Sequence, residues 1–263
     1  MCEDCGCSSV DSYTVHLDPA HHAGGSHSHH GHGHDHGHGS HAHYAPTSAT
    51  IPLNTPILAQ NDRIAERNRG FLKAKGITAL NLISSPGSGK TTLLARTLEE
   101  LDGRCPAAVI VGDLATDNDA RRLRERSAEV LQITTGTACH LDASMVARAL
   151  DHLDLANVRL LFIENVGNLV CPAAFDLGEA LRVALLSCTE GEDKPLKYPP
   201  LFGSAHAVVL TKTDLAEAAG FDIPLALANL DRAAPSAPRF PLSSRTGDGF
   251  PAWIDFLTSL PRS

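Results

Sequence analysis

The chain has 263 residues, of which 43% are apolar and 20% charged, so it is long enough for one large folded domain with an appendage. Its 22 basic and 30 acidic residues give a formal net charge of −8, which argues against a nucleic-acid surface and an anionic-membrane surface. No basic start leads into an apolar stretch, and no window reaches the roughly 18 apolar residues of a membrane span. We therefore expect a cytoplasmic protein without nucleic-acid or membrane partners, whose seven cysteines are metal ligands, reactive thiols or core residues.

The beginning of the chain differs in composition from the rest. It starts with MCEDCGC, and residues 16–43 are almost entirely His, Gly, Ser, Ala and Asp. Such a composition cannot bury enough apolar surface to offset the entropy of ordering the backbone. We expect residues 1–43 to form a disordered tail, residues 44–56 with their three prolines a linker, and residues 57–263 one folded domain. The three cysteines at the start could be a redox pair with a spare, a disulfide, or a set of soft metal ligands.

The folded domain alternates apolar segments with helix-length amphipathic segments. A helical pattern starts near Thr55 and ends at Gly76. The apolar segments are nearly continuous, which is typical of strands covered on both faces in a parallel sheet. We therefore expect an α/β fold with a mostly parallel sheet, helices on both faces, and the ligand at the carboxyl ends of the strands. The expected strands are 77–84, 107–113, 158–165, 182–188 and 205–211, and the expected helices between them are 90–102, 118–129, 142–153 and 222–232.

The segment SSPGSGKTT follows the first expected strand and precedes a helix, which is the context of the phosphate-binding loop of P-loop NTPases. Gly87 and Gly89 let backbone N–H groups turn inward around phosphate oxygens. Lys90 can reach the β- and γ-phosphates, and the Thr91 hydroxyl can bind Mg²⁺. Ser84 stands where this pattern usually has its first glycine, which departs from the strict pattern but keeps its working parts. The expected nucleotide-binding residues of this loop are Gly87, Ser88, Gly89, Lys90, Thr91 and Thr92.

Two strand ends supply acidic groups for a nucleotide site. Glu164 and Gly167 form an E-x-x-G version of the D-x-x-G of GTPases, so Glu164 can hold Mg²⁺ and the Gly167 amide can reach the γ-phosphate. Taken alone, Glu164 could also be an acid that ends a buried strand by chance. Asp113 ends the second expected strand, where a carboxylate can contact Mg²⁺ or position water, whereas Asp117 could simply cap the next helix. We expect Lys90, Asp113 and Glu164 to carry the catalysis.

The segment VVLTKTD indicates which base is bound. Lys212 and Asp214 directly follow an apolar strand, and a carboxylate there can accept hydrogen bonds from guanine N1–H and N2–H₂, which adenine does not offer in that arrangement. The Lys212 stem can pack on the base. Thr211 occupies a position where Asn is commoner. The sequence therefore leaves open whether one supporting hydrogen bond of this loop is made. Ser244 or Arg245 can supply a backbone N–H to guanine O6. The sequence therefore predicts that GTP and GDP are the nucleotides.

A group of metal-ligating residues lies inside the domain. Cys139 and His140 are adjacent in TGTACHLDA, and Cys171 falls four residues after Gly167. Thiolate and imidazole together fit Zn²⁺ or Ni²⁺. A single Cys or His would more often be part of the core, but the three together, beside a nucleotide-sensing loop, indicate ligands. Residues without such company are expected to be structural, namely Cys105, Cys188, His152 and His206.

Several segments together resemble the HypB family of hydrogenase nickel incorporation proteins. They are the N-terminal C-x-x-C-G-C, the His-rich tract, AERNRGF, SSPGSGKTTLL, GDLATDNDARR, TTGTACHLDA, IENVGNLVCPAAFDLGE and LTKTDL, and they span nearly the whole chain. The resemblance implies a metal-regulated GTPase of the SIMIBI class that forms a GTP-dependent homodimer. It also implies that a HypA-type metallochaperone is a partner and that nickel is delivered to the hydrogenase large subunit. By this resemblance, Cys2, Cys5 and Cys7 match the high-affinity nickel motif, and Cys139, His140 and Cys171 match a second metal site.

The tail can then be interpreted as a nickel-binding segment. Three thiolates within six residues can surround one ion without a folded scaffold, and the α-amino group of residue 1 can be a fourth donor for Ni²⁺. A redox role for Cys2 and Cys5 stays open, although C-x-x-C serves that way where it opens a helix in a thioredoxin-like fold. The histidines of residues 16–43 offer weak, exchangeable sites suited to nickel storage, or else form a solvated spacer. Two other functions stay open: a urease-type nickel chaperone GTPase, and a nickel buffer with little catalysis.

Overall fold

The computed structural model describes residues 14–16, 54–101, 103–113, 118–124 and 129–262. Several predictions fall outside them, and these stay predictions: those on Cys2, Cys5, Cys7, Asp117 and the His-rich tract. Within the described part of the chain, no helix combines the length and the apolar character that crossing a membrane requires.

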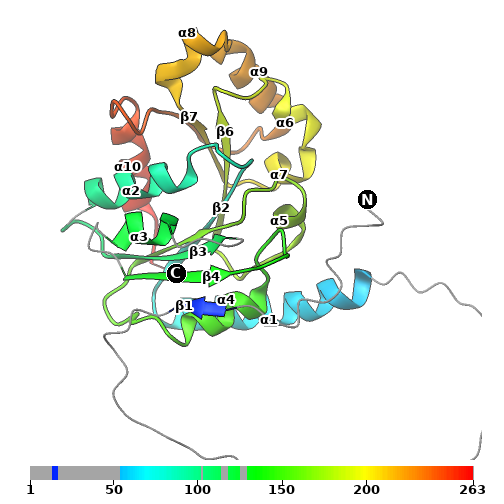
Figure 1. Ribbon diagram of the computed structural model, residues 1–263, viewed down its shortest axis with the longest axis vertical. Helices are drawn as coiled ribbons and strands as arrows, with labels where there is room; N and C mark the ends of the chain where they lie inside the picture. Colours follow the sequence, from blue (N-terminus) through cyan, green and yellow to red (C-terminus); the bar gives the residue numbers. More distant parts are fainter. Residues whose placement is uncertain (1–13, 17–53, 102, 114–117, 125–128, 263) are drawn as a thin grey trace, which may run out of the picture.

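In the described residues, eight strands form one sheet with the order β1-β4-β3-β5-β2-β6-β7-β8. The strands from β2 to β8 run parallel to their neighbours, and β1 runs antiparallel to β4. β2 lies between β5 and β6, so the loop that follows β2 emerges near the middle of the sheet (Figure 1). The strands are β1 (Thr14–His16), β2 (Thr78–Ile83), β3 (Ala107–Asp113), β4 (Glu129–Thr134), β5 (Leu160–Glu164), β6 (Leu181–Ser187), β7 (Ala207–Thr211) and β8 (Arg239–Pro241).

The sequence prediction of the strands is largely confirmed. β2, β3, β5, β6 and β7 correspond to the five expected segments, and their burial on both faces explains their continuous apolar sequences. The prediction misses β4, because the polar residues Gln132 and Thr134 interrupt its apolar pattern although Gln132 is buried. The helix expected over 118–129 is confirmed for Asn118–Arg124, which form α3, and is wrong at Glu129, which belongs to β4. Residues 125–128 lie outside the described residues.

Helices cover both faces of the sheet, as predicted. Alternate strand residues point to opposite faces, so Leu80 and Leu82 of β2 join one core cluster whereas Ala79 joins another. Helices α2, α3 and α10 cover the first face, where the indole N–H of Trp253 donates to Thr97 Oγ1 at 3.0 Å and links α10 to α2. Helices α1 and α4 lie side by side on the second face, and α7 and α9 follow further along it (Figure 1).

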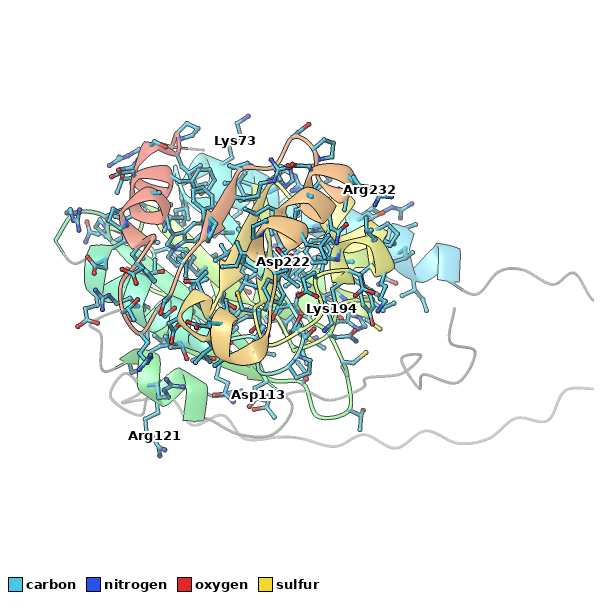
Figure 2. The ribbon with its side chains drawn as sticks, turned by 90° about the horizontal axis from the view of Figure 1, so that it is seen from above. Lys73, Asp113, Arg121, Lys194, Asp222 and Arg232 are labelled. Atoms are coloured by element: carbon cyan, nitrogen blue, oxygen red, sulfur yellow. The ribbon has the colours of Figure 1, made fainter. Side chains whose placement is uncertain are left out.

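Several helices carry charged side chains on their outer surfaces, and Figure 2 shows Lys73, Arg121 and Arg232 pointing away from the sheet. α1 begins at Asn54, inside the expected linker, and ends just before Gly76. The helices are α1 (Asn54–Ala74), α2 (Lys90–Leu101), α3 (Asn118–Arg124), α4 (Ala143–Leu150), α5 (Cys171–Ala174), α6 (Lys194–Lys197), α7 (Pro199–Gly203), the 3₁₀ helix η2 (Thr213–Leu215), α8 (Ala216–Ala219), α9 (Ile223–Ala233) and α10 (Phe250–Ser259).

Residues 14–16 depart from the prediction of an unstructured tail. They form β1, in which Val15 lies opposite Ile133 of β4. Without β1, β4 would be the edge of the parallel sheet, and an edge strand presents unpaired N–H and C=O groups to which another strand readily adds. The remainder of the tail lies outside the described residues, so the prediction of disorder there stays a prediction.

Candidate functional site

The phosphate loop occupies residues 84–89, between the end of β2 and the start of α2. Gly87 and Gly89 have φ angles of 71° and 96°, a region that residues with a Cβ rarely adopt. These two positions therefore let the backbone turn so that successive N–H groups can face an anion at the start of a helix. Lys90, the first residue of α2, is buried to 8% exposure. The loop has the strand–glycine–helix geometry that the sequence predicts.

Ser84 fits the position where the strict pattern has glycine. Its φ angle is not positive, so the backbone does not require glycine there. The Ser84 hydroxyl is fully buried, accepts a hydrogen bond from Lys90 Nζ at 2.9 Å, and is also bonded by the Ser88 hydroxyl. Ser84 Oγ in turn donates to the Ser85 carbonyl oxygen at 2.9 Å. The serine thus orients the loop lysine from inside the loop.

Two carboxylates stand at neighbouring strand ends beside this loop. Thr91 Oγ1 donates to Glu164 Oε1 at 2.7 Å, and both residues are buried. Asp113 ends β3, which pairs with β5 so that Val111 lies opposite Glu164. A hydroxyl and carboxylate oxygens are the hard donors that Mg²⁺ prefers. The chemistry of Thr91, Asp113 and Glu164 therefore fits this ion.

The E-x-x-G segment packs directly on the phosphate loop. A Cβ added at Gly167 would lie 2.8 Å from Pro86 Cα and 3.0 Å from Pro86 N, closer than side chains and backbone approach in proteins. Gly167 is thus needed for close contact between two backbones, and its place in the sequence pattern reflects that need. Asn168, the next residue, donates from Nδ2 to the carbonyl oxygen of Cys139 at 3.4 Å.

The end of β7 is also tied to the phosphate loop. Thr211 Oγ1 donates to the Ser88 carbonyl oxygen at 2.7 Å, so threonine supplies the supporting bond that the sequence left open. Lys212 adopts a left-handed conformation with φ 59° and ψ 37°, and its Nζ donates to the Gly87 carbonyl oxygen at 2.7 Å. Its stem passes over the loop, because a Cβ at Gly89 would lie 3.8 Å from Lys212 Cε. A base-recognition loop and a phosphate loop are therefore fastened together.

Asp214 is held as a carboxylate by two side chains. Ser243 Oγ donates to Oδ1 at 2.6 Å, and Arg245 Nε donates to Oδ2 at 2.9 Å. The Ser243 hydroxyl lowers the pKa of the Asp214 carboxyl most, and Arg245 lowers it further, so both outweigh the effect of burial. Ser243 also accepts bonds from the backbone N–H groups of Arg245 and Thr246, both at 3.2 Å. The roles expected for the backbone N–H groups of Ser244 and Arg245 stay predictions.

The predicted metal ligands come together. Cys139 and His140 lie in the loop between β4 and α4, and Cys171 is the first residue of α5. Their ligand atoms all lie within 4.8 Å of one another, and Cys139 Sγ is 3.8 Å from His140 Nδ1. The His140 ring packs on Phe175 with ring centroids 4.0 Å apart. We call Cys139, His140 and Cys171 the metal cluster.

The electrostatics of the cluster favour metal binding. Burial lowers the pKa of His140, against the opposite effect of the Asp142 carboxylate, so the imidazole is neutral at pH 7. A neutral imidazole is the form that binds a metal ion. Two sulfur atoms and one nitrogen form a donor set that fits Zn²⁺ or Ni²⁺. Among the described residues the site has three donors, so a four-coordinate ion needs one more ligand.

Of the four residues expected to be structural, Cys105, Cys188 and His206 have structural surroundings, and the prediction for His152 stays a prediction. Cys105 and Cys188 are buried, and burial raises the pKa of both thiols, to about 11 for Cys188. His206 Nδ1 accepts a bond from the backbone N–H of Arg182 at 3.0 Å, which is a structural contact. His152 is exposed, beyond the end of α4.

Sequence reasoning missed two residues at the nucleotide end of the sheet. One is Ser243, which orients Asp214. The other is Lys194 of α6 (Figure 2), whose Nζ donates to Ser85 Oγ of the phosphate loop at 2.7 Å and pairs with Glu190 Oε2 at 3.1 Å. Part of the signal for Lys194 was in the sequence, because the charged segment TEGEDK follows an expected strand whose carboxyl end lies at the ligand edge of the parallel sheet. That β6 lies next to β2 comes only from the structure.

Comparison with known proteins shows the family. A family model for the CobW/HypB/UreG nucleotide-binding domain matches residues 78–240. A hydrogenase maturation factor HypB from Azotobacter vinelandii is 51% identical over 217 residues, which cover 82% of this chain and 72% of that protein. The crystal structure of HypB from Archaeoglobus fulgidus has a TM-score of 0.72 at 42% identity, covering 76% of this chain and 98% of that chain. The crystal structure of HypB from Helicobacter pylori in complex with nickel has a TM-score of 0.71 at 40% identity, and it covers 75% of this chain and 93% of that chain.

The matched region contains the phosphate loop, the E-x-x-G segment, the metal cluster and the Thr-Lys-Thr-Asp sequence that ends β7. The fold, the site and the similarity to these relatives thus agree, and the resemblance found in the sequence is confirmed. The chain belongs to the HypB family of P-loop nucleotide-binding proteins, within the CobW/HypB/UreG group.

Proposed function

We propose that this protein is a nickel-binding GTPase that stores and delivers Ni²⁺ for hydrogenase maturation and couples GTP hydrolysis to metal transfer. One observation carries the proposal: Gly167 packs on Pro86 of the phosphate loop, and Cys171 of the metal cluster follows four residues later. A segment that packs on the phosphate loop therefore carries a metal ligand. The curated relative named as a hydrogenase maturation factor and the HypB structure in complex with nickel support the same function.

In the proposed hydrolysis, water adds to the γ-phosphorus of GTP while the bond to the β–γ bridging oxygen breaks, which gives GDP and phosphate. Lys90 and the N–H groups of the loop stabilise the negative charge on the phosphate oxygens. Asp113 positions the attacking water, and Thr91 and Glu164 with Asp113 are the residues that would hold Mg²⁺. When bound, Mg²⁺ neutralises charge on the β- and γ-phosphates.

Guanine selectivity rests on Asp214. Its ionised carboxylate accepts from guanine N1–H and N2–H₂, whereas adenine presents no matching pair of donors. Arg245 Nε bonds Asp214 Oδ2 at 2.9 Å, so guanine competes with this side chain for one oxygen, while Ser243 keeps the other in place. The Lys212 stem, which lies over the phosphate loop, covers the base.

The metal ion is cargo in this proposal. The metal cluster holds Ni²⁺ or Zn²⁺, and its missing fourth donor comes from water or from the second chain of a GTP-dependent homodimer. In the cytoplasm, a HypA-type metallochaperone and the hydrogenase large subunit are the protein partners. Cys2, Cys5 and Cys7 form a tight nickel site, and the His-rich tract is a reservoir of weaker sites.

The test combines an enzyme assay with complementation. Purified full-length protein should hydrolyse GTP but not ATP, and only with Mg²⁺. In a strain that lacks this gene, the parent should restore hydrogenase activity at low nickel, and Cys139→Ser or Cys171→Ser should not. Restoration by Lys90→Ala as complete as by the parent would support a nickel buffer instead. Loss of urease activity with normal hydrogenase activity would support a urease-type chaperone.

A further inference from the structure

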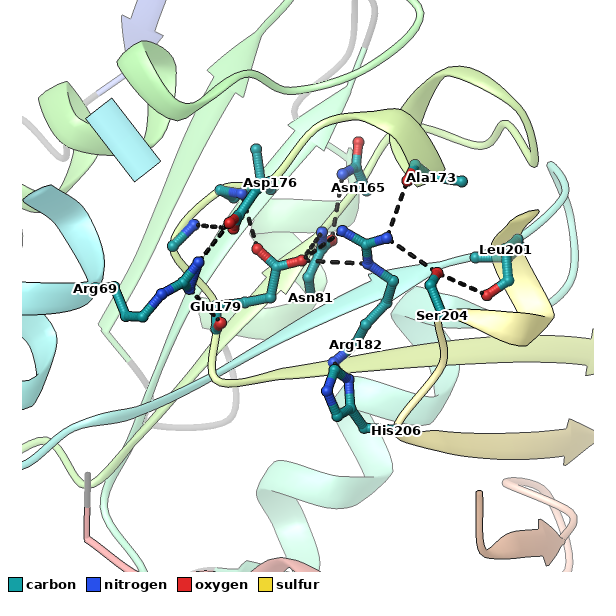
Figure 3. Close-up of polar contacts among 12 residues, drawn as sticks. Arg69, Asn81, Asn165, Ala173, Asp176, Glu179, Arg182, Leu201, Ser204 and His206 are labelled. Atoms are coloured by element: carbon teal, nitrogen blue, oxygen red, sulfur yellow. Dashed lines mark hydrogen bonds and ion pairs between the residues drawn. The ribbon is translucent and has the colours of Figure 1, made fainter. Parts of the chain in front are cut away.

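Four side chains at the second face of the sheet form a continuous chain of hydrogen bonds, which we call the polar network: Asn165, Asn81, Glu179 and Arg182 (Figure 3). Asn165 Nδ2 donates to Asn81 Oδ1 at 3.2 Å, and Asn81 Nδ2 donates to Glu179 Oε1 at 3.2 Å. Arg182 bonds the same Glu179 oxygen through Nη2 at 3.1 Å and Nε at 3.3 Å. The network thus crosses from β5 through β2 to the start of β6.

Both halves of the metal cluster are attached to this network. At one end, Asn165 Oδ1 accepts a bond from the backbone N–H of Leu141 at 3.1 Å, and Leu141 directly follows the ligand His140. At the other end, Arg182 Nη1 donates to the carbonyl oxygen of Ala173 at 2.9 Å. Ala173 lies in the four-residue helix α5, which begins with the second thiolate ligand. Two ligand segments that are far apart in the sequence therefore share one set of side chains.

The same network reaches the nucleotide side. Asn165 lies between Glu164 and Gly167, and its Oδ1 also accepts from the backbone N–H of Val166 at 3.0 Å, which shapes the turn of the E-x-x-G segment. Asn81 belongs to β2, the strand that leads into the phosphate loop. A shift of the E-x-x-G segment against the phosphate loop must therefore move Asn165, and with it the contacts to both ligand segments.

The burial of the polar network indicates that its residues hold neighbouring groups in position. Asn81 is fully buried, Asn165 is 1% exposed, and the side chains of Glu179 and Arg182 are 5% and 12% exposed. Apolar residues of similar volume often stabilise a fold as well as a buried ion pair does, so folding alone does not require these groups. Buried polar networks do hold their members in one geometry, and partners around metal ligands set how those ligands are oriented.

We propose that the polar network couples the two sites: Asn165 and Arg182 are positioning residues that set the distance between the Cys139–His140 loop and Cys171 according to the position of the E-x-x-G segment. This inference rests on the proposed function, because it assigns the residues through which nucleotide state changes metal affinity. Without the network, both segments still contain their metal-ligating residues, but their relative position no longer depends on the nucleotide.

The test measures metal affinity in two nucleotide states. The full chain is used with Cys2, Cys5 and Cys7 each changed to Ser, so that thiolate-to-nickel absorbance reports the metal cluster while the histidines of the tail are the same in every variant. Ni²⁺ is titrated with GDP and with a non-hydrolysable GTP analogue. We expect the two affinities of this parent to differ by about 5-fold to 150-fold, the usual range of allosteric coupling.

The variants remove bonds of the network step by step. Arg182→Lys keeps the charge opposite Glu179, but one ammonium cannot replace the guanidinium that bonds Glu179, Ala173 and Ser204 together. Ser204→Ala is the milder variant, because it removes one acceptor of Arg182 Nη1 at 3.0 Å. Arg69→Lys is the matched control, since Arg69 contacts Glu179 only at its backbone oxygen, at 2.9 Å.

We expect Arg182→Lys to bring the affinity ratio to within about 2-fold of one, Ser204→Ala to lower it less, and Arg69→Lys to leave it unchanged. A merely structural role would weaken metal binding equally in both nucleotide states, and an unchanged ratio in both network variants would overturn the inference alone. A ratio of one in the parent would overturn the inference together with the coupling in the proposed function. If Arg182→Lys does not fold, the ratio in Ser204→Ala decides.

Discussion

The nucleotide site and the metal cluster are built in different ways. The nucleotide site is made of contiguous motifs that are bonded to one another, as the Thr211 hydroxyl and the Lys212 ammonium donate to the carbonyl oxygens of Ser88 and Gly87. The metal cluster takes two ligands from one loop and one from a four-residue helix, and it supplies three donors per chain. The first site is preorganised, and the second depends on how its two segments are placed. We therefore expect a change of nucleotide to act on the metal cluster by moving its two segments relative to each other.

The largest expected effect is confined to the nucleotide site. Lys90→Ala removes the buried ammonium at the phosphate loop and should lower GTP hydrolysis by about 1,000-fold, because charge stabilisation at the transition state is lost. Nickel binding by the tail and by the metal cluster should be unchanged in the absence of nucleotide. Lys73→Ala, an exposed lysine on α1, is the control. Hydrolysis at the parent rate in Lys90→Ala would remove the phosphate loop from the mechanism.

The next variant acts where the two sites meet. Gly167→Ala places a Cβ 2.8 Å from Pro86 Cα, so the E-x-x-G segment must move away from the phosphate loop. We expect hydrolysis to fall by about 100-fold, since a shift of about 1 Å in a catalytic group has that effect.

The matched control for this variant is Gly70→Ala. A Cβ at Gly70 has no atom within 4 Å, and alanine should stabilise α1 by about 0.5–1 kcal/mol. Both variants are compared by steady-state GTP hydrolysis and by thermal unfolding. Equal rates for Gly167→Ala and Gly70→Ala would show that the close approach to Pro86 does not matter for catalysis.

The same contrast explains how much the sequence could predict. The phosphate loop, the E-x-x-G segment and the Lys-Thr-Asp sequence are local patterns with fixed chemistry, so their positions follow from the strand and helix order. The nearness of Cys139 and His140 to Cys171 was inferred from residue types, and the structure confirms it. The family resemblance was also visible in the sequence.

What the sequence could not predict are contacts between distant segments. Ser243 reaches Asp214 across 29 positions, and Lys194 reaches Ser85 across 109. β4 escaped because Gln132 is polar but buried, so tertiary packing overrides its local pattern. The sequence likewise does not show that Asn81 and Glu179, which are 98 positions apart, bond each other in the core.

A smaller effect concerns the orientation of Asp214. Ser243→Ala removes the 2.6 Å bond to Oδ1 but leaves the Arg245 bond to Oδ2. A hydrogen bond to a charged group contributes about 1.5–3 kcal/mol, so GTP and GDP affinities should fall about 10-fold together. Equilibrium binding of fluorescent GDP and GTP measures the change, and Ser259→Ala on α10 is the control. Metal affinity without nucleotide should stay at the parent value. A lower metal affinity in Ser243→Ala would show that this residue also affects the metal cluster.

The smallest effect concerns the ion pair that fastens α1 near the metal cluster. Burial by itself raises the pKa of the Asp176 carboxyl, but the backbone N–H of Gly178 and the Arg69 guanidinium outweigh it and lower that pKa. Because the folded pKa lies below the unfolded value, the contribution to stability is complete above the ordinary Asp pKa of about 3.9. It is lost as the pH falls through the lower, folded value.

Arg69→Met should therefore reduce the free energy of unfolding at pH 7 by less than about 1 kcal/mol, because the two side chains are 35% and 34% exposed and water screens the pair. The difference between parent and variant should shrink as the pH falls below about 4, since protonation of Asp176 removes the pair in the parent as well. Urea unfolding from pH 7 to pH 2.5 measures both curves. Arg96→Met is the matched control, since it breaks an ion pair of 32% exposure on α2, which covers the opposite face of the sheet. A difference between parent and Arg69→Met that stays constant down to pH 2.5 would contradict the role given to Asp176, and would assign the loss to the Arg69 bond with the Glu179 carbonyl oxygen.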